Sequence, residues 1–322
     1  MKRGKNKGKM KKFEKYKNNY LKYLQTLNRS ENTIIMYDFA LEYYKNFLKS
    51  KEKNRSEYYT LQTIIEYKKY LDETKNKINL TGLAEATKIN LFCKLSFFFR
   101  YLLDNQIIFV NPFDKIDRIK KPEVLPKNIP QQEEVLKILN SIPLKTLYNY
   151  RDRTIFELAY STGVRRMEIA NLTIYDVDLN NGFIQVKLGK GRKDRIVPIG
   201  KIACDFLEYY IRKIRPKLLK ENYSEQILFV DRFGKKLSLQ AVHVIFRTRI
   251  AESDIKKNFT CHSFRHACAT EMLKGKASIK HVQEMLGHSF LSSTQIYTQT
   301  QPLDLLEVHK KTHPSWNLFE EN

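Results

Sequence analysis

The chain has 322 residues, 42% of them hydrophobic, so it can bury a sizeable core and global disorder is excluded. It carries 58 lysines and arginines against 35 acidic residues, a formal net charge of +23. This excess favours a polyanionic partner, with nucleic acid the first candidate, although a lysine-rich surface that only reflects an AT-rich genome is the alternative. The sequence has no apolar run long enough to span a bilayer, and its four cysteines form no CxxC pair, which predicts a cytoplasmic protein without disulfides.

The N-terminal part of the chain is predicted to be helical. Residues 1–12 are nearly all basic or small and bury nothing, so we expect a disordered arm there. From Phe13 onward, apolar residues recur every three or four positions in four successive stretches. Asn111-Pro112 ends the pattern, because the residue before a proline resists helical geometry. Residues 13–118 are therefore expected to form an all-helical domain.

A linker separates this domain from a larger one. Residues 119–131 contain three prolines, which predicts an extended chain. Helical patterns resume at residue 132 and continue to about residue 312, interrupted by the stretch GFIQVKLGKGRKDRIVPIG. There, Ile184, Val186 and Leu188 alternate with the residues between them, which is typical of a strand, and RIVPI is the returning strand of a hairpin. The sequence thus predicts a mainly α-helical fold with a small β-sheet.

The first candidate functional patch is YSTGVRRMEIANL. Ser161 or Thr162 is expected to cap a helix that begins near Val164. This would place Arg165 and Glu168, three residues apart, on one helical face. An ordinary surface ion pair is the alternative explanation for this patch alone.

The second patch is the tip of the predicted hairpin. Lys190 lies there between two glycines, which allow backbone and lysine to approach a phosphate closely. The spacing is not that of a nucleotide-binding P-loop. A solvated turn lysine is the alternative.

The third patch is CHSFRHACAT. His262, Arg265 and His266 share one helical face, with Cys261 and Cys268 close in sequence. The ligand spacing of a zinc site is missing, and an arginine between the histidines would repel a cation. A guanidinium binds two phosphate oxygens at once, and an imidazole can donate or accept a proton, so this face suits an anion.

The fourth patch is LGHSFLSSTQIYT. Gly287 is placed to end one helix, and Ser292 and Gln295 have the spacing of a capping box for the next. His288 would lie in the turn and Tyr297 in the new helix, where a half-buried core tyrosine is the alternative. Near the cations of the other patches, however, a tyrosine can become a nucleophile toward phosphorus, because cations favour the phenolate over its ordinary pKa of about 10.

Taken together, these motifs resemble those of tyrosine recombinases of the phage-integrase and Xer type. TGVRRMEI, GKGRKDRIVP, HSFRH and LGHSFLSSTQIYT occur in the family's order and spacing. SENTIIMYDFALEYYKNFL and FFFRYLLDNQIIFVNPFDKI resemble the family's N-terminal core-binding domain, and VHKKTHPSW resembles the Xer branch. The match covers almost the whole chain after residue 12.

The resemblance implies a role for seven residues and requires no cofactor or metal. Arg165 and Arg265 would hold the scissile phosphate. Lys190 would be the general acid for the leaving 5′ oxygen, and Tyr297 would be the nucleophile. His262 and His288 fill two histidine positions of the family. Glu168 matches an acidic position that orients its neighbours and does not react.

The resemblance also implies a fold and partners. An all-α, SAM-like core-binding domain at 13–118 and an α+β catalytic domain at 132–300 would form a C-shaped clamp around double-stranded DNA with an inverted-repeat site. Residues 301–322 would be a tail exchanged between the protomers of a homotetramer on two duplexes. A DNA translocase or an accessory protein would be a further partner, and the nucleoid the expected location.

Two other function classes stay open. A type IB topoisomerase-like relaxing enzyme would use the same cage and tyrosine, but it has no use for an exchangeable tail such as PLDLLEVHKK. A non-catalytic DNA-binding regulator would predict loss of Tyr297 or an arginine, and all are present. For a recombinase, chromosome dimer resolution during partition and cell division and integration or excision of a mobile element are both open roles.

Overall fold

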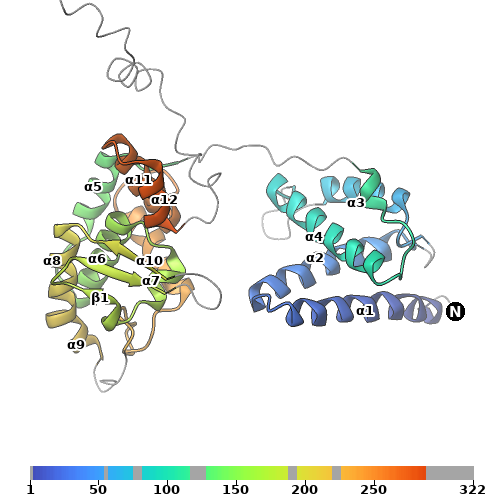
Figure 1. Cartoon of the computed structure of the whole chain (residues 1–322), viewed down its shortest axis with the longest axis horizontal. Helices are drawn as coiled ribbons and strands as arrows, with labels where there is room; N and C mark the ends of the chain where they lie inside the picture. Colours follow the sequence, from blue (N-terminus) through green and yellow to red (C-terminus); the bar gives the residue numbers. More distant parts are fainter. Residues whose placement is uncertain are drawn as a thin grey trace, which may run out of the picture. The chain divides into compact units, whose positions relative to one another are not determined.

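The computed structural model describes residues 3–53, 57–74, 82–116, 128–187, 194–219 and 226–287. The chain divides into two compact units, Met1–Glu123 and Val124–Asn322 (Figure 1). Each unit has its own hydrophobic core. The fold is mainly helical with a small antiparallel sheet, as the sequence predicts. None of the helices in these ranges is long and apolar enough to cross a membrane.

The first unit consists of helices with well-defined starts. Ser30 caps the second helix by accepting a hydrogen bond from the Thr33 backbone N–H at 3.3 Å, and Thr60 caps the third by accepting one from Thr63, also at 3.3 Å. The elements of this unit are α1 (Arg3–Thr26), α2 (Glu31–Ser50), α3 (Leu61–Glu73), α4 (Glu85–Asp104) and the 3-10 helix η1 (Pro112–Lys115).

Helix α1 corrects one expectation. The sequence pattern places residues 1–12 in a disordered arm, whereas α1 begins at Arg3. Lysine is a good helix former, and extending an existing helix is far easier than nucleating one. A helix that is held where Phe13 packs can therefore continue toward the N-terminus. Met10 also packs against the core of this unit, and its Sδ accepts a hydrogen bond from the Tyr58 hydroxyl at 3.1 Å.

Aromatic rings fill the core of the first unit. Phe13, Tyr44 and Phe98 are fully buried, and the ring centroid of Phe13 lies 6.1 Å from that of Tyr44 and 5.9 Å from that of Phe98. Tilted and edge-to-face contacts of this kind stabilise a core beyond the area they bury. The Tyr44 hydroxyl donates to the backbone carbonyl of Tyr58, so its polar end is satisfied inside the core.

The second unit is larger and contains the four patches. Its helix α6 packs against α5, α8 and α11. The helical elements are α5 (Gln132–Ser141), α6 (Leu147–Thr162), α7 (Arg166–Asn171), η2 (Ile174–Asp176), α8 (Lys201–Tyr209), the π-helical turn η3 (Tyr210–Ile214), α9 (Arg215–Leu219), α10 (Leu239–Glu252), α11 (Cys261–Lys274) and α12 (Ile279–Leu286).

The sheet of the second unit is an antiparallel meander in the order β1-β2-β3, formed by β1 (Val177–Asp178), β2 (Phe183–Val186) and β3 (Arg195–Pro198). Ile184 on β2 pairs with Val197 on β3, and both side chains are fully buried. The predicted hairpin and its alternation are therefore confirmed, with Phe183 and Gln185 exposed on the other face. Strand β1 was not predicted, because two residues are too few to show an alternation.

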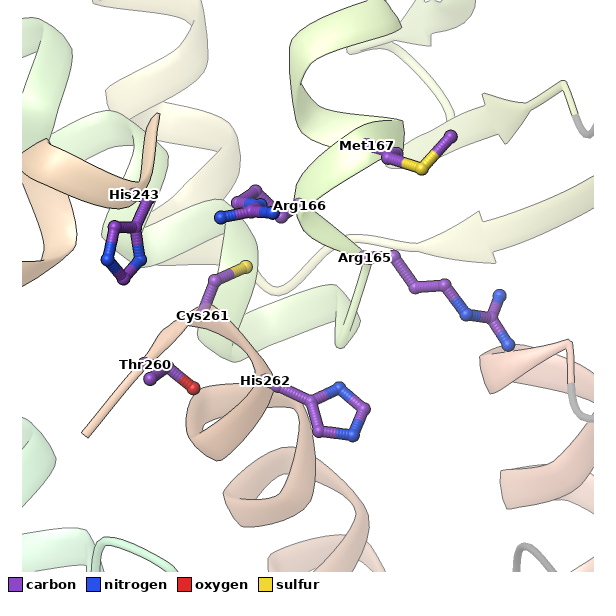
Figure 2. Close-up of a pocket in the computed structure, with 7 residues that line it drawn as sticks. All are labelled: Arg165, Arg166, Met167, His243, Thr260, Cys261 and His262. Carbon is purple, nitrogen blue, oxygen red and sulfur yellow. The ribbon is translucent and has the colours of Figure 1, made fainter. Parts of the chain in front are cut away.

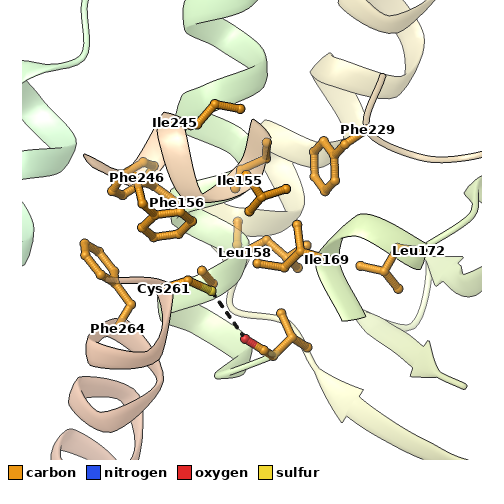
Figure 3. Close-up of a cluster of buried hydrophobic side chains, with 14 of the residues drawn as sticks. Ile155, Phe156, Leu158, Ile169, Leu172, Phe229, Ile245, Phe246, Cys261 and Phe264 are labelled. Carbon is orange, nitrogen blue, oxygen red and sulfur yellow. Dashed lines mark hydrogen bonds between the residues drawn. The ribbon is translucent and has the colours of Figure 1, made fainter. Parts of the chain in front are cut away.

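The core of the second unit fixes the start of α11 against the loop before α7 (Figure 3). Phe156 on α6 stacks on Phe246 of α10, with ring centroids 4.2 Å apart. Its ring also meets Phe264 of α11 edge to face at 5.1 Å. Cys261, the first residue of α11, lies in the same cluster with its Sγ 3.9 Å from the Val164 carbonyl oxygen. These contacts bring the first and third patches together.

Candidate active site

A break between two helices positions the first patch. Helix α6 ends at Thr162, whose hydroxyl donates to the Leu158 carbonyl, so the prediction that Ser161 or Thr162 caps the next helix is wrong. Gly163 follows with φ 61°, a left-handed conformation that ends helices and that glycine adopts without strain. A Cβ at this glycine would lie 2.6 Å from Leu286 Cδ2, so the close approach of α12 also requires glycine here.

Arg165 and Glu168 meet at the start of α7, as the sequence predicts. Arg165 is the residue before the helix, and its backbone N–H donates to Glu168 Oε2 at 2.7 Å. Its guanidinium also donates to Glu168 Oε1 at 2.9 Å. The arginine side chain is 35% exposed, whereas the glutamate side chain is only 6% exposed. The contact is therefore more than a solvated surface pair, because one partner is buried.

A second arginine holds the same carboxylate. Arg195, at the start of β3, donates to both Glu168 oxygens, at 3.0 and 2.8 Å. Burial of Glu168 raises its pKa, but the hydrogen bonds from Arg195 and from the Arg165 backbone outweigh burial, so the pKa lies below its ordinary value. Glu168 is therefore ionised, and its carboxylate links the hairpin to the start of α7. These contacts support the predicted role of Glu168 in orienting its neighbours.

Arg265 is the most deeply buried charge of the site. It projects from α11, is 1% exposed, and donates to the carbonyl oxygens of Gly163 at 2.6 Å and Leu286 at 2.5 Å. These acceptors are backbone dipoles without formal charge. These two hydrogen bonds orient the guanidinium and do not themselves cancel its positive charge.

Three arginines from three different segments converge on the end of α12. The last carbonyl groups of a helix have no partner inside it and form the negative end of the helix dipole, so they suit cations. Gly287 follows with φ 64° and ends α12 where the sequence predicts. The three hydrogen-bonded pairs are Arg195 with Met285 (2.7 Å), Arg265 with Leu286 (2.5 Å) and Arg165 with Gly287 (3.0 Å).

His262 stands beside this cluster at the start of α11. Partial burial, and then the positive charges of Arg265 and Arg165, lower the pKa of its imidazole below the ordinary 6.5. The ring is therefore neutral at neutral pH and can accept a proton.

An open pocket of about 450 Å³ lies in front of these residues (Figure 2). Figure 2 shows His243 on α10 and Thr260 and His262 at the start of α11, with Arg165 on the far side from His243. The residues that line the pocket are Arg165, Arg166, Met167, His243, Thr260, Cys261 and His262. The lining has a strongly basic character, which suits a phosphate-bearing ligand.

The remaining members of the third patch are buried or half-buried. Burial and the charges of His262 and Arg265 lower the pKa of His266 to about 4, and its ring lies 4.4 Å from that of His262. Burial raises the pKa of the Cys261 and Cys268 thiols to about 12. In the part of the chain that the structure describes, no three His, Cys, Asp or Glu side chains are grouped as metal ligands.

Comparison with known proteins places this geometry in a family. The sequence profile of the phage integrase family matches residues 130–303. The chain belongs to the phage integrase family. A curated relative, the tyrosine recombinase XerD of Staphylococcus saprophyticus, is 35% identical over 92% of this chain and 97% of its own length.

Solved structures of similar proteins agree in fold. The crystal structure of the XerH site-specific recombinase in a post-cleavage complex with its difH substrate has a TM-score of 0.72 and 24% identity, over 88% of this chain and 80% of that one. A lambda integrase tetramer bound to a Holliday junction has a TM-score of 0.68 and 19% identity, over 90% of this chain and 79% of that one. These likenesses establish a phage-integrase fold for the chain.

Three predicted site residues of this integrase-family chain lie outside the described residues: Lys190, His288 and Tyr297. The same holds for the predicted capping pair Ser292 and Gln295, for the tail 301–322 and for most of the linker 119–131. The described residues end at Gly287, directly before His288. The chain therefore continues toward His288 and Tyr297 from Gly287, whose carbonyl oxygen accepts a hydrogen bond from Arg165.

The structure adds Arg195 to the candidate site. Its guanidinium reaches Glu168 and α12 at once, and its side chain is only 9% exposed. In the sequence, Arg195 is a charged residue at the start of the apolar strand RIVPI. The simpler interpretation of such a residue is an exposed side chain on a strand. Only the antiparallel return of the hairpin reveals the partner.

Proposed function

We propose that this protein is a site-specific tyrosine recombinase that cuts and rejoins duplex DNA through a 3′-phosphotyrosyl intermediate. One phosphodiester is exchanged for one phosphotyrosyl bond and then restored, so the reaction conserves bond energy and needs no ATP. Catalysis rests on stabilising the charge that develops at a five-coordinate phosphorus, which preorganised cations do well. The observation that carries the proposal is that Arg165 and neutral His262 line one basic pocket, while Arg165 and the buried Arg265 both donate to the end of α12.

In the first step the phenol oxygen of Tyr297 attacks the scissile phosphorus. The bond from phosphorus to the 5′ oxygen breaks, and Lys190 protonates that oxygen as it leaves. His262, being neutral, accepts the phenol proton. Arg165 and Arg265 bind the non-bridging oxygens, and Glu168 holds Arg165 in place. A 5′ hydroxyl from the partner duplex then attacks the phosphotyrosine, releases Tyr297 and completes strand transfer.

The proposed nucleophile can be tested directly. A binding site is first selected from a random duplex library, and a nicked version of it serves as a suicide substrate that traps the covalent adduct on a denaturing gel. Tyr297→Phe should form no adduct while keeping its affinity for the site. Tyr175→Phe is the matched control, because it changes a 72% exposed tyrosine that lies far from Tyr297 in the sequence. This variant should form the covalent adduct like the wild type. Equal trapping by Tyr297→Phe would reject the assignment.

We further propose that the substrate is an inverted-repeat site in double-stranded DNA. The net charge of +23 supports a phosphate-dominated interface. If six to ten phosphates are neutralised, affinity should fall about 10³–10⁵-fold between roughly 50 and 200 mM salt. Both units would contact the duplex, with 13–118 as the core-binding domain, 132–300 as the catalytic domain and 119–131 linking them.

The proposed assembly is a homotetramer on two duplexes, joined by exchange of the tail 301–322. Leu303, Leu306 and Val308 give the tail an apolar side that favours docking on a neighbouring protomer. The lambda integrase in the solved tetramer complex has the same fold, which supports this assembly. Deletion of the residues after Thr300 should leave binding of one protomer intact and abolish strand exchange. Normal synapsis by the truncated chain would contradict tail exchange.

The biological role we propose is of the Xer type, with chromosome dimers in the nucleoid as the substrate and a DNA translocase or accessory protein as a partner. The support is the relative named XerD, which aligns along 97% of its own length. The test is genetic: deleting the gene should produce filamentous cells with unpartitioned chromosomes. Loss of transfer of a mobile element with normal partition would favour an integrase role.

A further inference from the structure

The pocket extends beyond the residues that the proposed reaction uses. Arg165 and His262 form one side of it, whereas Arg166, His243 and Thr260 form the other (Figure 2). In Figure 2 the guanidinium of Arg166 and the imidazole of His243 approach the same space from α7 and α10. The reaction at the scissile phosphate has no role for this second side.

The two sides differ in how their polar side chains are engaged. Arg165 is bound to Glu168 and Gly287. Arg166 and His243, in contrast, have no hydrogen bond or ion pair with any residue in the described ranges of the chain. A polar group without a protein partner at the edge of a basic pocket is available to a ligand. Among the described residues that line the pocket there is no carboxylate to neutralise the Arg166 guanidinium.

The volume of the pocket exceeds the need of one phosphate. The pocket is open and has a volume of about 450 Å³, so more than one phosphate-sized group can enter it. A DNA strand carries a phosphate for about every 3.4 Å of helix axis, so a strand whose scissile phosphate is bound at Arg165 brings its neighbouring phosphates close by. Arginine, threonine and histidine side chains are all suited to contact phosphate oxygens.

We propose that Arg166, His243 and Thr260 form a second phosphate subsite, which binds the phosphodiester next to the one that Tyr297 attacks. This inference rests on the proposed function. It adds how the protein holds the DNA strand beside the reacting bond. The exposed Arg166 guanidinium supplies the charge, and the His243 imidazole and the Thr260 hydroxyl supply shorter, directional contacts. Two adjacent phosphates held at once would fix the direction of the strand as well as the position of the phosphorus.

The subsite can be tested by removing the charge from one phosphate at a time. Two nicked suicide substrates carry a neutral methylphosphonate at the linkage immediately 5′ or immediately 3′ of the scissile one, and a third is unmodified. Wild-type protein should lose on the order of ten- to hundredfold in its rate of adduct formation at low DNA concentration on one of the modified substrates. The loss should appear in the apparent KM more than in the maximal rate.

The variants identify the side chains that contact this phosphate. Arg166→Gln, alone and with His243→Gln, should lose a similar factor on unmodified DNA and should then be insensitive to the methylphosphonate that slows the wild type. Arg166→Lys should recover part of the loss. Arg212→Gln is the control, because it removes the charge of a 69% exposed arginine outside the pocket and should respond to the methylphosphonates like the wild type.

The possible outcomes separate the two proposals. If wild-type protein forms no adduct even on unmodified nicked DNA, the proposed function fails. If it forms the adduct but neither methylphosphonate slows it, the subsite does not exist. The subsite is also rejected if the losses from Arg166→Gln and from the methylphosphonate multiply, because two groups that contact each other cannot each cost the full factor twice. Arg166 is exposed, so the single variant is expected to fold and gives an interpretable result.

Discussion

Two buried arginine networks in the second unit look alike and differ in their balance of charge. In the first, Arg151 on α6 donates to Asp152 at 3.0 and 2.8 Å, and Arg249 on α10 donates to the same carboxylate at 3.0 and 2.7 Å. Arg249 also pairs with Glu252 at 2.8 Å. Two arginines therefore meet two carboxylates, and the network is neutral.

The second network surrounds the end of α12 and is not balanced. Arg165, Arg195 and Arg265 gather there, and within the described residues Glu168 is the carboxylate that lies among them. Backbone carbonyls at the end of α12 and at Gly163 also accept from these arginines, and such acceptors orient a guanidinium without cancelling its charge. The comparison suggests that the neutral network stabilises the fold, whereas the cationic network retains positive charge that can act on a phosphate. Four substitutions test this division.

The largest effect is expected from Asp152→Asn in the neutral network. The change leaves Arg151 and Arg249 buried without their shared negative charge, and breaking such a pair costs about 3–5 kcal/mol. Urea unfolding should show this loss, while adduct formation per folded molecule should stay near that of the wild type. Glu252→Gln is the control, because its carboxylate is 47% exposed and should cost less than about 1 kcal/mol. A large loss of cleavage in the folded Asp152 variant would contradict the division.

The opposite pattern is expected from Arg165→Gln in the cationic network. Removing a cation that stabilises the transition state should lower the rate of adduct formation about 10²–10³-fold. The side chain is 35% exposed, so the free energy of unfolding should fall by only about 1 kcal/mol. The same suicide substrate and urea titration give both numbers. If this variant and the Asp152 variant lose stability and cleavage in the same proportion, the two networks are not distinct.

The dependence of the free energy of unfolding on acid pH should reveal the contribution of Glu168. Its pKa is lower in the folded than in the unfolded chain, so its stabilisation is present above the ordinary value of 4.5 and is lost as the pH falls through the folded-state pKa. Glu168→Gln should therefore cost about 1.5–3 kcal/mol at pH 7 and progressively less as the pH falls below 4.5. Urea titrations of both proteins across this range give the comparison. Parallel curves would mean that the carboxylate does not stabilise the fold.

The smallest effect is expected from a methyl group at the end of α12. Gly287→Ala forces alanine to a φ of 64°, which costs about 1–2 kcal/mol, and its Cβ would lie 3.0 Å from Arg195 Cδ. Gly275→Ala is the matched control, since that glycine has a φ of −73° and its Cβ would meet only carbonyl oxygens at 3.4 Å. Thermal melts should separate the two variants. Equal melting temperatures would show that the end of α12 tolerates a side chain.

The sequence predicted those features that depend on short spacings. The alternation around Ile184 requires only a period of two, and the arginine and glutamate of the first patch meet because they are three residues apart on a helix start. Gly287 was recognised as a helix end because glycine accepts the left-handed conformation that ends a helix. In each of these cases the decisive interaction lies within a few residues along the chain.

Features that depend on long-range packing were not predicted. Arg195 meets Glu168 across 27 residues, and the contact exists only after the hairpin folds back onto α7. The segment STGV was assigned to a helix start because Ser and Thr favour that position, but Gly163 faces Leu286 and the third patch, so the chain ends a helix there. His243 and Arg166 also come together only through the packing of α10 against α7.

The end of α12 has a consequence for protein engineering. Its last carbonyl groups are tied to a strand, a second helix and a loop, so the direction in which the chain leaves Gly287 is set by the body of the second unit. A segment joined after this glycine would leave the second unit in the same direction, whatever its own composition. Gly287 is therefore a natural splice point for chimeras. C-terminal segments of different relatives could be exchanged there, and their assembly partners compared, without redesign of the residues that precede it.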